Sequence, residues 1–290
     1  MAMWLTVQLR RHNHALLALP ALIWLLLFFI LPLFLVLVIS VLTRNTGGVP
    51  GLPFTFEHYE RVFSTFNGVF VQSVVIAAQT TLICLLMGYP LAFFISTRQR
   101  AFVRGFLLFL VILPFWTNFL VRTYALRVLL GLEGPINGVL VQFGLVGEPV
   151  AFLNTEFAVI VGLVYGFLPF MVLPIYASVE RLDFRLVEAA RDLGANDWHT
   201  FWRVVLPLTL PGIVAGCALV FIPAIGAFVT PDLLGGVKGL MIGNLIQRQY
   251  SGTGNLPLGA ALSTVMLGAV MLTLLIYAWF SGRRNTIHDQ

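Results

Sequence analysis

The sequence predicts an all-α integral membrane protein with six transmembrane helices, and three observations support this fold class. Of its 290 residues, 59% are hydrophobic and 10% are charged, whereas a soluble domain carries roughly 25% charged residues. The apolar residues gather in six stretches, and each is long enough to cross a bilayer core, which takes about 20 residues. Arginine is concentrated in alternate connecting segments, as the positive-inside rule requires. Soluble and disordered classes are therefore excluded.

The six apolar stretches are separated by more polar connecting segments. They run over 19–42, 69–97, 102–124, 157–179, 206–229 and 258–280. Five of them contain internal prolines, at Pro32, Pro90, Pro114, Pro169, Pro174, Pro211 and Pro223. A proline removes a backbone hydrogen bond, which a membrane helix tolerates where neighbouring groups take up the freed carbonyl. We therefore expect kinked helices, which can either pivot around a central cavity or form a static bundle.

The distribution of basic residues predicts that both termini are cytoplasmic. This orientation places eleven basic residues inside: Arg10, Arg11, Arg98, Arg100, Arg104, Arg181, Arg185, Arg191, Arg203, Arg283 and Arg284. Six lie outside: Arg44, Arg61, Arg122, Arg127, Lys238 and Arg248. The expected organisation is a cytoplasmic segment 1–18, a six-span domain 19–281 with a cytoplasmic loop at 181–205, and a cytoplasmic tail 282–290.

The outer segments differ in character. Residues 44–66 read as a turn-rich loop followed by a short amphipathic piece, and 136–143 form a possible short helix within the longest outer loop. Residues 231–257 are rich in glycine. An external delivery protein could dock on these loops, although each of them could equally be a simple connector.

A polar island between the fourth and fifth spans, residues 183–207, predicts a helical elbow. Asp183 is a candidate N-cap, and Gly194 is a natural helix stop because glycine adopts the left-handed C′ conformation at little cost. Asn196 can cap a second short helix, and Pro207 suits the first turn of the apolar helix that follows. Composition alone also fits an amphipathic loop that rests on lipid headgroups.

The spacing within this elbow resembles the "EAA" signature of ABC-importer permeases. The signature residues are Glu188, Ala189, Ala190, Gly194, Leu206 and Pro207, and Val204 stands where the family has isoleucine. The resemblance implies a type I importer permease whose cytoplasmic coupling helix sits in a cleft of a separate ATPase subunit. Import, as opposed to export, is likewise implied by the resemblance.

Few polar groups lie at membrane depth to receive a transported solute. Glu156 opens the fourth span and Asp232 follows the fifth, and acids near the outer mouth would favour a cation. Trp116, Asn118 and Tyr165 are further pathway candidates, because aromatic faces attract ammonium groups by roughly 0.5–2 kcal/mol. The alternatives are solvated acids at headgroup level and interfacial or packed aromatic rings.

Motifs in all six spans are similar to those of the permease subunits of bacterial spermidine/putrescine ABC importers. They are 88–90, 113–118, 166–174, 187–195, 207–216, 232–236 and 241–244. The resemblance implies a polyamine cargo and a multi-pass location in the bacterial inner membrane. It also implies a heterodimer with a second permease, two ATPase subunits and a periplasmic binding protein. Opines, aminoethylphosphonate and γ-aminobutyrate are alternative cargoes of similar permeases.

The sequence offers no catalytic constellation and no metal-ligand spacing. Its five histidines are scattered, which disfavours an integral-membrane enzyme. A phosphate-binding Gly-x-x-x-x-Gly-Lys-Ser/Thr loop is absent, so ATP and Mg²⁺ are expected on partner ATPase subunits. A proton- or sodium-driven transporter is a further alternative, and uptake that survives an uncoupler but needs ATP would exclude it. Cys84 and Cys217 are expected to act as small packing residues, and no nucleic-acid contact is expected.

Overall fold

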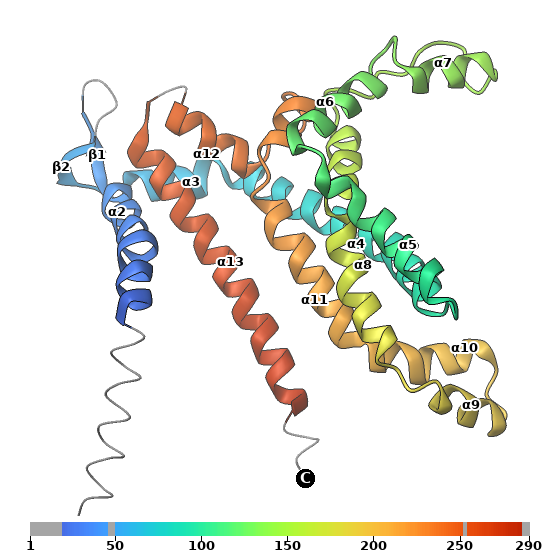
Figure 1. The fold of residues 1–290 in the computed structure, drawn as a ribbon. Coiled ribbons are helices and arrows are strands. Elements are labelled where there is room, and N and C mark those ends of the chain that lie inside the picture. Colours follow the sequence, from blue (N-terminus) through green and yellow to red (C-terminus); the bar gives the residue numbers. More distant parts are fainter. Residues whose placement is uncertain (1–18, 46–49, 252–253, 286–290) are drawn as a thin grey trace, which may run out of the picture. The chain divides into compact units, whose positions relative to one another are not determined.

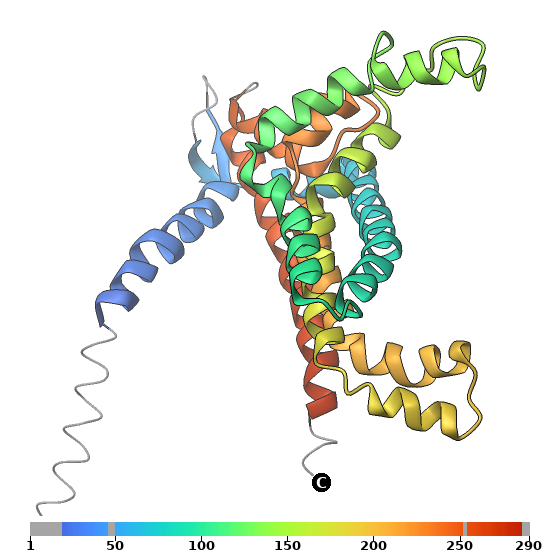
Figure 2. The ribbon, with the colours of Figure 1, turned by 45° about the vertical axis from the view of Figure 1, so that its right-hand side comes forward.

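The computed structural model describes residues 19–45, 50–251 and 254–285, which are mostly helical and include one small β-pair (Figures 1 and 2). The chain divides into two compact units. One joins the residues up to 65 with 248–267, and the other joins 66–247 with the residues from 268 onward.

Five of the predicted spans are confirmed as single helices long and apolar enough to cross a membrane. They are Leu19–Ser40, which includes η1 (Leu26–Ile30) and α2 (Leu31–Ser40), α4 (Asn67–Ser96), α8 (Glu156–Glu180), the run Asp197–Ile225, and Leu256–Leu275 within α13 (Leu256–Asn285). The count reaches six if one bent pair of helices is taken as a single span. Hydropathy therefore located these spans, with the largest difference at the fifth, whose helical run begins at Asp197 and not at residue 206.

The third span, predicted as one helix over 102–124, is wrong as a continuous element. It consists of α5 (Ala101–Ile112), the 3₁₀ turn η2 (Leu113–Trp116) and α6 (Phe119–Leu129), and its two halves meet at 93°. Pro114 lies at the start of η2, and Thr117 is extended, with φ −96° and ψ 146°. Asn118 then starts a new helix, because its side chain accepts a hydrogen bond of 2.8 Å from the Leu120 N–H. The chain thus turns sideways in mid-span.

The first unit contains the only β-structure among the described residues, and the all-α prediction did not include it. Strands β1 (Leu42–Arg44) and β2 (Pro50–Phe54) pair antiparallel, and α3 (Glu57–Thr65) follows them. Tyr59 Oη lies 2.6 Å from Ser40 Oγ, and His58 Nε2 lies 3.1 Å from the Leu42 carbonyl. These contacts fix α3, the predicted amphipathic piece, against the end of α2.

The outer segments carry more helix than the sequence suggested. The possible helix at 136–143 is confirmed as α7 (Pro135–Gln142). The glycine-rich stretch, by contrast, contains the π-turn η4 (Pro231–Gly235) and a ten-residue helix, α12 (Ile242–Ser251). Gly243 allows this helix to form where it does, because a Cβ there would lie 2.6 Å from the Ala227 carbonyl oxygen.

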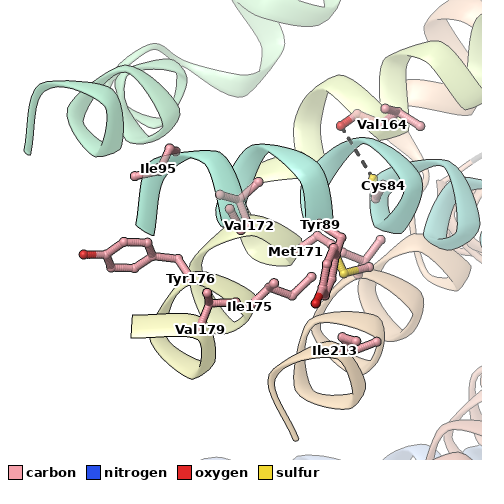
Figure 3. Packing of buried hydrophobic residues seen from close by; sticks show 12 residues of the cluster. Cys84, Tyr89, Ile95, Val164, Met171, Val172, Ile175, Tyr176, Val179 and Ile213 are labelled. Atoms are coloured by element: carbon pink, nitrogen blue, oxygen red, sulfur yellow. Dashed lines mark hydrogen bonds between the residues drawn. The ribbon is translucent and has the colours of Figure 1, made fainter. Parts of the chain in front are cut away.

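Helices α4, α8 and α11 (Leu206–Ile225) build the core of the second unit. Figure 3 shows its buried side chains, which include Tyr89 and Ile95 from α4, Met171 and Ile175 from α8, and Ile213 from α11. The small-xxx-small spacing of Gly212 and Gly216 brings α11 close to α8. A Cβ on Gly212 would lie 2.5 Å from the Pro174 carbonyl oxygen, and one on Gly216 would lie 2.8 Å from Met171 Sδ.

The two ends of this unit carry different structures. Helices α9 (Arg185–Asp192) and α10 (Asp197–Thr200) lie at the end where α8 finishes and α11 begins (Figure 1). Helices α6 and α7 lie at the opposite end of α8, as both ribbon views show. The predicted elbow and the predicted outer mouth are therefore at opposite ends of the same bundle.

Candidate functional site

The elbow bends at Gly194, as the sequence predicted. Gly194 has φ +84°, and its N–H donates to the Arg191 carbonyl at 2.9 Å, while the Ala195 N–H donates to the Ala190 carbonyl at 3.0 Å. This pair of bonds is the Schellman arrangement, which satisfies the last carbonyls of a helix and needs a left-handed residue at C′. At the other end of α9 the N-cap position is Phe184 and not the predicted Asp183. Asp183 lies one residue earlier, and its Oδ1 accepts from the Arg185 N–H at 3.0 Å.

The second half of the elbow is capped by Asn196 and then continues without interruption. Asn196 Oδ1 accepts from the His199 N–H at 2.9 Å. The expected separation of a short helix from the fifth span is wrong: α10, the π-turn η3 (Phe201–Val205) and α11 form one helical run from Asp197 to Ile225. Pro207 suits this course, because it follows the π-turn at the first turn of α11.

The Glu-Ala-Ala residues occupy the exposed face of α9. Glu188 and Ala189 are exposed and Ala190 is half-buried. Within the described residues the Glu188 carboxylate forms no hydrogen bond or ion pair, and it does not pair with an arginine. Arg191 instead binds Asp197 across the bend, with Nη2 2.8 Å from Oδ1. Glu188 is consequently available to a group outside this chain.

A groove of about 470 Å³ opens on the inner side of the bend. Its lining residues are Ala190, Leu193, Gly194, Ala195, Asn196, His199, Thr200, Arg203 and Val204. Leu193 is 90% exposed at the apex. Small and apolar side chains thus surround the exposed leucine at the bend. Leu206 is half-buried and Pro207 is exposed at the start of α11, so these two signature residues set the base of the elbow.

Glu156 lies in the first turn of α8, at the outer end of the bundle. Gln72 of α4 donates to Glu156 Oε1 at 2.8 Å and to the Lys238 carbonyl oxygen at 2.6 Å. This amide therefore ties the start of α8 to α4 and to the segment after η4. Asp232 is exposed within η4, and its N–H donates to the Phe228 carbonyl at 3.0 Å.

The three remaining pathway candidates gather around the broken span. Trp116 is 76% exposed and meets Phe109 edge to face at 5.7 Å, so its outer face is open. Asn118 uses its side-chain oxygen for the cap described above. Tyr165 of α8 is 43% exposed and is joined to the break through an arginine. The structure thus brings Trp116, Asn118 and Tyr165 to one region, and Glu156 and Asp232 belong to other elements.

That arginine is Arg122, which sequence reasoning treated only as the charge that closes the third span. Its guanidinium lies 5.7–5.9 Å from the rings of Phe115, Phe119 and Tyr165. Its Nε and Nη1 atoms are shielded from solvent and have no hydrogen-bond partner among the described residues. The sequence signal that could have indicated these contacts was the presence of phenylalanines on both sides of the break, at Phe115 and Phe119.

No metal centre accompanies these residues. In the part of the chain that the structure describes, no three His, Cys, Asp or Glu side chains lie close enough to hold a metal ion. Cys84 is buried in the helical core and Cys217 is half-buried against it, and neither forms a disulfide. Both cysteines pack as the sequence predicted.

Most of this chain is similar in sequence to a known protein family and to known transport proteins. Residues 85–286 match the family model of the binding-protein-dependent transport system inner membrane component. The chain is 47% identical to the spermidine/putrescine transport system permease protein PotB of Haemophilus influenzae, over 90% of this chain and 91% of that one. It is 44% identical to PotB of Escherichia coli, over 90% and 94% of the two chains.

The fold is also found among solved structures. A chain of a bacterial ABC transporter involved in the import of the acidic polysaccharide alginate superposes with a TM-score of 0.74. The alignment covers 98% of this chain and 99% of that one at 19% sequence identity. At this identity the comparison establishes the fold, which is that of a type I importer permease, and carries no statement about cargo.

Proposed function

Because the chain belongs to the family of binding-protein-dependent transport system inner membrane components, we propose that it is the permease subunit of a polyamine importer. In this role it passes putrescine or spermidine across the inner membrane. The observation that carries the proposal is the 47% identity to a spermidine/putrescine permease over nine-tenths of both chains. The chain itself contributes a pathway and a coupling surface, and no catalytic step.

The elbow supports a partnership with ATPase subunits. Its Leu193 and its unpaired Glu188 carboxylate are exposed and a groove lies along its bend, so another protein can reach them. In the proposed assembly two ATPase subunits bind ATP and Mg²⁺, and one of them receives this elbow. A second, related permease supplies the other half of the pathway, and a periplasmic binding protein delivers the solute at the opposite end.

Cargo movement then follows from a change between two states of the pathway. Closure of the ATPase subunits displaces the elbow, and the proline-containing helices α8 and α11 convert this displacement into opening at the outer end. A delivered solute shifts this equilibrium only through its different affinity for the two states. The Glu156 carboxylate at the outer end and the open face of Trp116 at the broken span suit a cargo that carries ammonium groups.

Reconstitution tests the proposal directly. The chain is assembled in proteoliposomes with its ATPase and second permease, and the binding protein is added with putrescine, spermidine or γ-aminobutyrate. We expect ATP hydrolysis and uptake to rise with one of the two polyamines and to persist in the presence of an uncoupler. Stimulation by γ-aminobutyrate alone would keep the importer and refute the cargo, and uptake abolished by the uncoupler would refute the ATP-driven class.

A further inference from the structure

A continuous row of aromatic rings connects the elbow with the helical core. Trp198 meets Trp202 at 5.6 Å between ring centroids and 68° between planes. Trp202 meets Phe201 at 5.7 Å and 85°, and Phe201 meets Tyr89 of α4 at 5.7 Å and 87°. All three contacts have the edge-to-face geometry that aromatic pairs prefer. Exposure falls along the row, from 66% at Trp198 through 50% at Trp202 to 9% at Tyr89.

The inner end of the row is fixed by a buried hydrogen bond. The ring of Tyr89 extends from α4 toward α11 (Figure 3), and its hydroxyl oxygen lies 3.1 Å from Thr209 Oγ1. Thr209 donates its single hydroxyl hydrogen to the Val205 carbonyl at 2.9 Å, so Tyr89 is the donor to Thr209. Tyr89 directly precedes Pro90, the proline inside α4.

The π-turn η3 explains how one helix can present two contacts to Tyr89. Phe201 and Thr209 are eight residues apart, which in a regular α-helix would turn them about 80° away from each other. A π-turn absorbs one additional residue, so the two side chains lie on one face as though they were two turns apart. Both therefore reach α4, one through its ring and the other through its hydroxyl.

We propose that this aromatic row, Trp198, Trp202, Phe201, Tyr89 and Thr209, transmits displacement of the elbow to α4 at its proline. This inference rests on the proposed importer function and names the residues through which movement of the elbow reaches the helical core. Helix α9 packs on α10 and η3, so a push on the exposed Glu-Ala-Ala face reaches η3. Phe201 passes the push to Tyr89, because edge-to-face rings in contact cannot approach further without overlap. Phe201 and Tyr89 are thus positioning residues for the coupling of ATP hydrolysis to transport.

The number of ATP molecules hydrolysed per solute transported tests this route in the complete reconstituted complex. Phe201→Leu keeps an apolar side chain and removes the ring contacts, and we expect it to raise this ratio by about 2- to 30-fold. Phe201→Tyr keeps the ring and should restore the ratio to near the wild-type value. Tyr89→Phe keeps the ring but loses the Thr209 bond, and an intermediate ratio is expected.

Phe93→Leu is the matched control. Phe93 lies on the same helix as Tyr89 and packs against the same core cluster, but it is not part of the row. A purely structural loss would lower hydrolysis and uptake together and leave their ratio unchanged. A wild-type ratio in Phe201→Leu, or an equal rise in Phe93→Leu, would overturn the inference.

The proposed function is judged separately, on the wild-type complex. The ratio is measured with whichever delivered solute stimulates wild-type hydrolysis, so a wrong cargo does not alter the result on the row. A wild-type complex that responds to no delivered solute would overturn both proposals.

Discussion

Substitutions of Gly194 can distinguish a requirement for the left-handed backbone at the bend from a requirement for empty space beside it. The residue has φ +84°, and a Cβ placed on it would meet no atom of this chain within 4 Å. Alanine at this position therefore adds backbone strain and no clash within the subunit. The left-handed conformation costs a non-glycine residue roughly 1–2 kcal/mol, which reduces the population of the native bend by a factor of about 5–30.

Three variants distinguish backbone strain, side-chain size and charge as causes of a loss of coupling. Gly194→Ala carries the full backbone strain. Gly194→Asn carries less, because asparagine tolerates the left-handed region. Gly194→Asp has nearly the same shape as asparagine but places a negative charge beside the C-terminus of α9, where the helix dipole disfavours it. We expect solute transport per ATP to fall in the order glycine, asparagine, alanine, aspartate.

The assay is uptake and ATP hydrolysis in proteoliposomes, with the amount of membrane-inserted complex measured in parallel. A wild-type ratio in Gly194→Ala would refute the argument from backbone conformation. Coupling that is lost more in Gly194→Asn than in Gly194→Ala would show that the size of the side chain matters, and hence that a partner needs the space.

Four further outcomes follow from named contacts. Gly216→Ala should lower the thermal midpoint of the complex, because its Cβ would lie 2.8 Å from Met171 Sδ and overpacking costs about 1–3 kcal/mol. Gly105→Ala, with no atom within 4 Å, is the control and should not lower the midpoint, because alanine favours the helix over glycine. A double-mutant cycle of Arg122→Met and Tyr165→Leu should give a coupling energy of about 0.5–2 kcal/mol, and independent effects would contradict the ring contact. Glu156→Gln keeps an acceptor for Gln72 but removes the negative charge. The attraction between two opposite unit charges 4 Å apart in water is about 1 kcal/mol, so the KM for putrescine uptake should rise about fivefold with kcat unchanged. An unaltered KM would exclude an attraction between the cargo and this carboxylate. Asp197→Asn should change stability by less than about 0.5 kcal/mol, because both partners of its ion pair are more than half exposed, and a larger loss on thermal unfolding would show that the pair has a structural role.

The sequence predicted those features that depend on local composition. Five spans were predicted from long runs of apolar residues. A single segment that crosses lipid satisfies its own backbone hydrogen bonds by forming a helix. The elbow follows from Gly194 and Asn196, whose side-chain chemistry determines the end of one helix and the start of the next.

The direction of the broken span did not follow from its composition. Residues 102–124 are predominantly apolar, and a hydropathy average does not report the direction of the helix axis. Pro114 indicated a kink, but the 93° bend also needs the extended Thr117 and the cap at Asn118. These two residues read equally well as parts of a continuous helix, so only the tertiary arrangement decides between the two.

Helix α12 and Arg122 were missed for a related reason. The glycines of 231–257 suggested loops, yet Gly243 serves the close approach of a helix to the Ala227 carbonyl. Arg122 was read as a charge at the membrane surface, and its ring contacts include Tyr165, forty-three positions further along the chain. The role of such a residue is defined by neighbours that no local pattern contains.

The unbroken run from Asp197 to Ile225 turns the elbow into a lever. Twenty-nine residues at 1.5 Å each give a rod of about 44 Å, so a tilt of about 10° around its midpoint would move each end by about 4 Å. A displacement of the elbow by less than the pitch of one helical turn would thus be matched by a similar displacement at Ile225, where the helix ends at Gly226. An uninterrupted helical run, even with Pro211 and Pro223 inside it, is what this segment contributes to the subunit.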